Sequence, residues 1–149
     1  MNRRTPLAAA LALTAGLALA GCDTGEAAPH FEVEGAYMPQ PVTQDMAGAF
    51  FTIKNNGAAD KIVSVTTDLA KDVSIHKTVG NKMEQVDSLP IPAGGEVRFE
   101  RGGSHMMFMG LKYKPAKGDS IGVTLQFAHA EPVKVAVPVR AANYQPKKS

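Results

Sequence analysis

Short segments rich in β-forming residues, separated by turn signals, follow one another along almost the whole chain after residue 30. We expect nine strands, at residues 31–38, 48–55, 61–67, 72–78, 83–89, 95–101, 105–111, 120–127 and 133–139. Clusters of Gly, Pro, Asn and Asp lie between them, as in NNGAAD and KPAKGD, and no segment forms a convincing amphipathic helix. This spacing favours an all-β sandwich or barrel.

The N-terminus is typical of a secretory signal: two arginines precede an apolar run from Leu7 to Ala20. The run is too short for a permanent transmembrane helix. It ends in Leu-Ala-Gly-Cys22, which resembles a bacterial lipobox, whose cysteine carries lipid and becomes the mature N-terminus. We therefore expect a lipoprotein signal peptide at residues 1–21, a lipid on Cys22, a flexible tether over residues 22–29, a domain over 30–141 and a polar tail over 142–149. The alternative is a free or buried thiol that happens to follow a signal sequence.

The charge balance gives no reason to expect a nucleic-acid partner. The whole chain has 16 basic and 14 acidic residues. Loss of the signal removes two arginines and no acid, which leaves the mature chain without net charge.

Cys22 is the only cysteine, so the domain has no disulfide. No Ser-His-Asp arrangement or general-base pair is visible, and we do not expect an enzyme. The expected location is extracytoplasmic, anchored by lipid to the bacterial cell membrane on its periplasmic side or at the cell surface.

One histidine and three methionines crowd the stretch SHMMFMG. Because successive side chains of a strand point to opposite faces, His105, Met107 and Met109 should share one face, with Met106 and Phe108 on the other. Thioether sulfur favours Cu(I), and imidazole also accepts copper. Methionine is equally an ordinary core filler, so this stretch alone does not decide between packing and a metal site.

A second histidine and methionine lie upstream, in VSIHKTVGNKMEQV. If this segment is a hairpin centred between Val79 and Gly80, His76 lies directly opposite Met83. Two such pairs would together supply four soft ligands, His76, Met83, His105 and Met107. That set suits Cu(I) and is poor for Zn(II) or Mg(II).

The spacing of these residues resembles the PCuAC family of periplasmic or extracellular copper(I) chaperones. That family joins a His and a later Met of one hairpin to a His-x-Met twenty-one residues further on. Here twenty-one residues separate Met83 from His105, and IPAGGEV and HMMFMGLK are similar to the family's wording. The chain departs from the pattern in the hairpin, where six residues rather than ten separate His76 from Met83. Loss of two residues from each arm would keep both ligands on one face, and Met109 is an alternative donor.

The resemblance implies a cupredoxin-like Greek-key β-sandwich that carries copper(I) as its cargo. It also implies delivery to the binuclear copper centre of cytochrome c oxidase subunit II, beside a Sco-type copper protein. Two other classes remain for comparison. An electron-transfer cupredoxin needs a cysteine thiolate in the domain, which this chain lacks. A structural or interaction β-sandwich lipoprotein would use its methionines only for packing.

Overall fold

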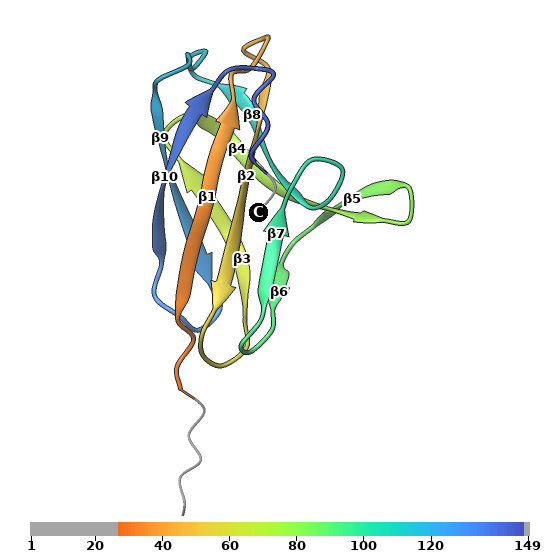
Figure 1. The fold of residues 1–149 in the computed structure, drawn as a ribbon, viewed down its shortest axis with the longest axis vertical. Coiled ribbons are helices and arrows are strands. Elements are labelled where there is room, and N and C mark those ends of the chain that lie inside the picture. Colours follow the sequence, from red (N-terminus) through yellow and green to blue (C-terminus); the bar gives the residue numbers. More distant parts are fainter. Residues whose placement is uncertain (1–26, 148–149) are drawn as a thin grey trace, which may run out of the picture.

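The computed structural model describes residues 27–147, which form ten strands and no helix (Figure 1). The strands are β1 Phe31–Pro39, β2 Met46–Asn55, β3 Asp60–Thr67, β4 Ala70–Val79, β5 Lys82–Val86, β6 Leu89–Ile91, β7 Glu96–Phe99, β8 His105–Leu111, β9 Ser120–Phe127 and β10 Val133–Arg140. Over the described range, nothing has the length and apolar character of a membrane-crossing helix. The predicted signal peptide, Cys22 and the first part of the tether lie outside the described residues.

The all-β prediction is confirmed, with one difference in the number of strands. The strand expected at residues 83–89 ends at Val86, and a separate short strand, β6, begins at Leu89. Asp87 and Ser88, both common turn residues, lie between the two. The break lets the chain change neighbours, because β5 pairs with β4 whereas β6 pairs with β3.

The strands form two layers joined through β1. One layer has the order β5-β4-β8-β2, with β7 also paired to β2, and the other has the order β10-β9-β3-β6. Strand β1 runs antiparallel to β2, and near its end it pairs in parallel with β10, through Met38 and Val139. Figure 1 shows β1 and β10 side by side, with β4 and β8 behind them.

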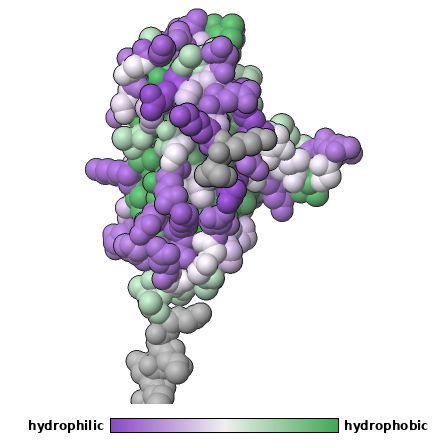
Figure 2. Space-filling model, viewed as in Figure 1, coloured by the Kyte–Doolittle hydropathy of each residue, from purple (hydrophilic) through white to green (hydrophobic). Residues whose placement is uncertain are grey.

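Alternate side chains of both layers fill the space between them. In β2, every second residue from Ala47 to Asn55 is buried, as expected for a strand with one face on a core. The largest fully buried side chains include Met38, Ile53, Ile62, Met106, Phe108 and Leu125. On the face shown in Figure 2, most of the surface is hydrophilic, with smaller apolar areas between.

The end of the predicted tether is held against the turn between β2 and β3. The N–H of Ala58 donates to the carbonyl of Ala27, and the N–H of Asn56 donates to that of His30. The buried side chain of Asn55 adds to this link, since its Oδ1 accepts a hydrogen bond from the N–H of His30. The chain therefore enters the sandwich at the end formed by this turn.

The hairpin of β4 and β5 projects from the body as an arm, seen on the right of Figures 1 and 2. His76 makes the last pairing of β4 with β8, and beyond it β4 pairs only with β5. Val79 and Lys82 are paired, so the tip is a two-residue turn of Gly80 and Asn81. Gly80 has a φ of +62°, the left-handed conformation that two-residue hairpin turns favour at this position. His76 thus lies where the arm leaves the body.

Candidate metal centre

His76 and His105, which are distant in sequence, are cross-strand neighbours. They are paired between β4 and β8. Their rings are stacked, with centroids 5.3 Å apart and planes 9° from parallel. His105 is 7% exposed, and His76 is half-buried. The fold therefore brings together the two histidines that the sequence proposes as ligands.

Met107 and Met109 lie on the same face of β8 as His105. Met107 is paired with Ser74 of β4, and Met109 with Asp72. Paired residues of neighbouring strands point to the same side of the sheet. Met106, in contrast, is fully buried in the core. The predicted alternation is confirmed: Met106 points into the core, and Met107 lies on the same face of β8 as His105, which we call the ligand face.

Met83 does not lie directly opposite His76, so the expected hairpin register is wrong. Met83 is paired with Thr78, and His76 is paired with Gln85. The turn is centred between Gly80 and Asn81, one residue later than expected. This moves the pairing by two positions and leaves the face unchanged. Met83 is 60% exposed and is a diagonal neighbour of His76, at a separation that long side chains can span.

The loop before β8 fixes the orientation of His105. Nδ1 of His105 lies 3.1 Å from the carbonyl oxygen of Gly103, and the hydroxyl of Thr78 donates to the same oxygen over 3.2 Å. A carbonyl oxygen only accepts, so Nδ1 carries a proton and Nε2 is the nitrogen left to bind a metal. Metal-binding histidines commonly make such a bond with their other nitrogen.

Ser74 orients the second histidine, and sequence reasoning missed it. Its hydroxyl oxygen lies 2.9 Å from Nε2 of His76. Ser74 is buried, lies two residues before His76 on β4 and is paired with Met107 of β8, so it adjoins both candidate ligands. The only sequence signal for this role is its position two residues before His76, which places both side chains on one face of a strand.

The donors gathered here are imidazole nitrogen and thioether sulfur. Among residues 27–147, no group of three or more His, Cys, Asp or Glu side chains is placed to hold a metal ion. Hard ions such as Ca²⁺ and Mg²⁺ require several oxygen ligands. The described face is therefore suited to a soft ion rather than a hard one.

A groove of about 300 Å³ opens beside Met107. Met46, Gly48, Phe50 and Arg101 also line it, together with the loop at residues 39–42 and Ala142. Met109 lies next to this groove, since it is paired with Met46, and it is 45% exposed. The groove gives the ligand face an opening to the surface.

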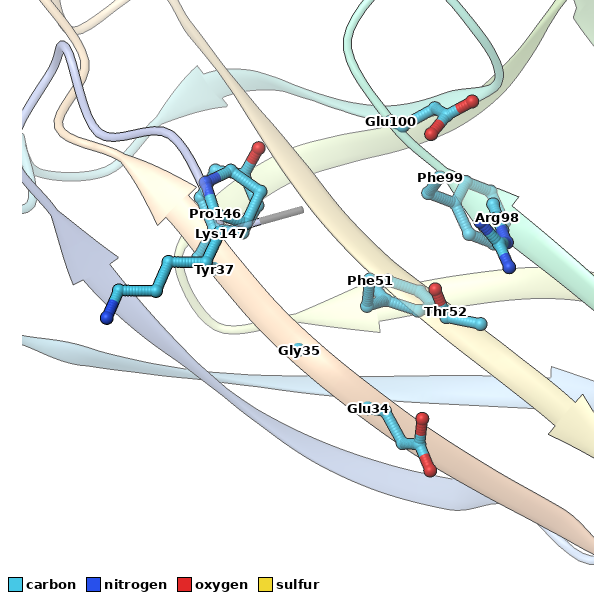
Figure 3. A pocket seen from close by; sticks show the side chains of 10 residues that line it. All are labelled: Glu34, Gly35, Tyr37, Phe51, Thr52, Arg98, Phe99, Glu100, Pro146 and Lys147. Carbon is cyan, nitrogen blue, oxygen red and sulfur yellow. The ribbon is translucent and has the colours of Figure 1, made fainter. Parts of the chain in front are cut away.

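A larger pocket, of about 600 Å³, has a different character (Figure 3). No histidine or methionine lines it. Glu34 and Glu100 lie at its two ends in Figure 3, and Arg98 lies along one wall. Its lining offers no soft ligand, so we do not place the metal centre there.

Comparison with sequences identifies relatives over most of the chain. Residues 31–139 match the family described as "Putative lipoprotein LpqE-like". A protein of Leifsonia xyli subsp. xyli, "Putative lipoprotein Lxx21020", is 39% identical over 101 residues, which cover 64% of this chain and 61% of that protein. The chain thus spans about three fifths of that relative's length.

Solved structures with the same fold include PCuAC domains. The apo PCuAC domain of PmoF2 has a TM-score of 0.69 at 20% identity, and the match covers 80% of this chain and 97% of that one. The copper-bound domain of PmoF2 has a TM-score of 0.67 at 21% identity, covering 78% and 97%. The solution structure of Cu(I)-DR1885 from Deinococcus radiodurans has a TM-score of 0.66 at 28% identity, covering 83% and 85%.

These likenesses confirm the expected cupredoxin-like β-sandwich and the resemblance to PCuAC proteins. The sequence match extends from the first residue of β1 almost to the end of β10 and includes every candidate ligand of the domain. The chain therefore belongs to the LpqE-like lipoprotein family, and its domain has the PCuAC fold.

Proposed function

We propose that this protein is an extracytoplasmic copper(I) carrier that binds one ion with His76, Met83, His105 and Met107. The observation that carries the proposal is the pairing of His76 with His105, with Met107 two residues further along the same face. The copper-bound state of related PCuAC domains supports it. Two imidazole nitrogens and two thioether sulfurs form a soft, uncharged ligand set, which favours Cu(I) over harder ions.

Loading requires a rearrangement at the histidine pair. The lone pair of an imidazole nitrogen lies in the plane of its ring, and the two rings are now nearly parallel, 9° apart. One ring has to turn before both nitrogens point at one ion. The ring of His76 is the one expected to turn, because it is half-buried and held only by the hydroxyl of Ser74, a bond that it would give up, whereas His105 is buried and held by Gly103.

The exposure of Met83 favours a carrier over a permanent metal centre. Its side chain is 60% exposed, on an arm that stands out from the body (Figure 1). A partner could contact the metal from this side and replace Met83 as a ligand. The alternative, a structural sandwich in which methionines only pack, does not explain why Met83 is 60% and Met109 45% exposed.

We further propose that Cys22 carries a lipid and holds the domain at the outer side of the cell membrane. The lipobox supports this, as does membership of a lipoprotein family. The PCuAC resemblance points to the binuclear copper centre of cytochrome c oxidase subunit II as the destination, together with a Sco-type protein. The destination is tested by mixing the loaded protein with the copper-binding domain of subunit II. Transfer of Cu(I) is measured by the optical absorption of the binuclear centre that forms.

Titration with Cu(I) under reducing conditions, against a competing chelator, tests the binding function. We expect tight binding by the mature chain and a large loss of affinity in the double variant His105→Ala/Met107→Ala. Tyr113→Ala is a surface control, because Tyr113 is 49% exposed and offers no soft ligand. Equal affinity in the double variant and the control would overturn the proposed site.

A further inference from the structure

Three methionines lie together at the far end of the ligand face. Met46, the first residue of β2, is paired with Met109 of β8. Met107 lies two residues before Met109 on the same strand and therefore points to the same side. Directly paired side chains have Cβ atoms about 5 Å apart, and diagonal neighbours remain within reach of long side chains. The three sulfur atoms can thus approach one another without any change of backbone.

The fourth position of this group is a glycine, which has no side chain to fill the space beside Met107. Gly48 of β2 is the partner of Met107. The space beside it is part of the groove of about 300 Å³, which Met46 and Met107 line together. A Cβ atom at this position would lie 3.5 Å from the ring of Phe50, which borders the space. The groove therefore connects Met107 with the open surface at Met46.

Packing does not account for the position of Met46 and Met109. Met38 and Met106 are fully buried and fill the core, whereas Met46 is 47% and Met109 45% exposed. Single exposed apolar residues are common on protein surfaces. Here, however, two long thioethers are paired with each other and adjoin a third that faces the histidine site.

We propose that Met46, Met107 and Met109 form a second, all-thioether Cu(I) site, through which copper enters or leaves the histidine site. The inference rests on the proposed function, since Met107 belongs to both sites. Cu(I) accepts thioether ligands readily. An ion held by the three methionines moves to the inner site when His76, Met83 and His105 replace Met46 and Met109 while Met107 remains bound. No bond of the protein is broken, and copper keeps its oxidation state.

The test uses the mature full-length chain in which both histidines are removed, His76→Ala/His105→Ala. Cu(I) is added under reducing conditions, and the side-chain methyl signals of all methionines are followed by NMR. We expect the signals of Met46, Met107 and Met109 to shift together, and those of buried Met38 and Met106 to stay in place. Unchanged signals of Met46 and Met109 would overturn the proposal.

A second set of variants removes the sulfur atoms but retains side-chain size. In the chain without the two histidines, Met46→Leu/Met109→Leu should lower the remaining Cu(I) affinity by roughly 10-fold or more. Both side chains are about half exposed, and Met-to-Leu exchange conserves volume, so folding should be retained. Met38→Leu in the same background is the control and should leave the affinity unchanged. Equal affinity in the two Leu variants would overturn the second site.

The two proposals fail in different ways. If Met46→Leu/Met109→Leu has no effect but removal of the histidines abolishes tight binding, only the second site is wrong. If removal of the histidines leaves tight binding intact, the histidine site of the proposed function is wrong.

Discussion

Nδ1 of His105 donates to the carbonyl oxygen of Gly103 over 3.1 Å, and this bond leaves only Nε2 of the ring free to bind a metal. The loop that supplies the carbonyl is compact. The N–H of Gly103 donates to the backbone carbonyl of Glu100, and Gly102 has a φ of +81°, which favours glycine. The metal site therefore depends on the turn before β8 as well as on its ligands.

The first prediction is that copper binds His105 through Nε2 while Nδ1 keeps its proton. Nitrogen-15 NMR of the imidazole rings, with and without one equivalent of Cu(I), distinguishes the two atoms. We expect a large shift of Nε2 and a retained proton at Nδ1. Coordination through Nδ1 would mean that the bond to Gly103 is broken on loading.

The second prediction separates two adjacent methionines. Met106→Ala should destabilise the fold by about 2–5 kcal/mol, because Met106 is fully buried, and should leave the ligand set whole. Met107→Ala should reduce Cu(I) affinity and cost much less stability, since Met107 is only half-buried and lies outside the core. Chelator competition and chemical denaturation of the metal-free form, measured on both variants, check this. A loss of Cu(I) affinity in Met106→Ala, with Met107→Ala binding copper as the wild type does, would contradict the prediction.

The third prediction concerns Asp60, at the start of β3, whose side chain is completely buried. Burial raises the pKa of this carboxyl, but hydrogen bonds from Ala130, Lys61 and His129 outweigh it and hold the pKa below the usual value of 3.8. Because the pKa is lower in the folded state, the stabilisation is complete above the unfolded-state pKa. It is lost as the pH falls through the folded-state value.

Replacement of Asp60 tests this dependence. Asp60→Asn should lower the free energy of unfolding by about 1–3 kcal/mol at neutral pH. The difference from the wild type should shrink as the solution is acidified below pH 3.8. Denaturation by urea at several pH values measures both quantities. Asp119→Asn is the control, because Asp119 is exposed and accepts a single bond from the N–H of Ala116. A difference that stays constant with pH would contradict the prediction.

The fourth prediction concerns Asn55, which is 1% exposed. Its amide donates to the carbonyls of Ala58 and Pro92, and its Oδ1 accepts from Gly57 and His30. Asn55→Ala should therefore cost about 2 kcal/mol or more, since several buried groups lose their partners.

Asn56→Ala is the matched control for Asn55, because Asn56 is the exposed neighbour and its backbone bond to His30 is retained. Chemical denaturation compares the two variants. We also expect Asn55→Ala to release the segment before β1, which amide hydrogen exchange at Asn56 and Ala58 would detect. Similar stability of both variants would show that Asn55 is not a structural link.

Local patterns in the sequence were sufficient for most strands and for the two faces of β8. Alternation along a strand is a local property, so the opposite directions of Met106 and Met107 could be predicted. The contact between His76 and His105 could not, because it depends on which strands pair across a long sequence separation. The PCuAC resemblance supplied that relationship indirectly, as a ligand set.

The register of the arm shows where local reasoning fails. A centre at Val79 and Gly80 and a centre at Gly80 and Asn81 both give an even loop and both place glycine in the turn. Only the second puts glycine at the first central position, which two-residue turns with one left-handed residue prefer. Ser74 was missed for another reason, since a serine in a strand has no pattern that distinguishes a histidine partner from an ordinary buried hydroxyl.

The central claim is that one Cu(I) ion binds nitrogen from two histidines and sulfur from two methionines. X-ray absorption of the mature chain loaded with one equivalent of Cu(I) measures the bound atoms directly. We predict two nitrogen and two sulfur neighbours, and loss of one of each in His105→Ala/Met107→Ala. A spectrum with only nitrogen and oxygen neighbours, or one that this double variant leaves unchanged, would contradict the account.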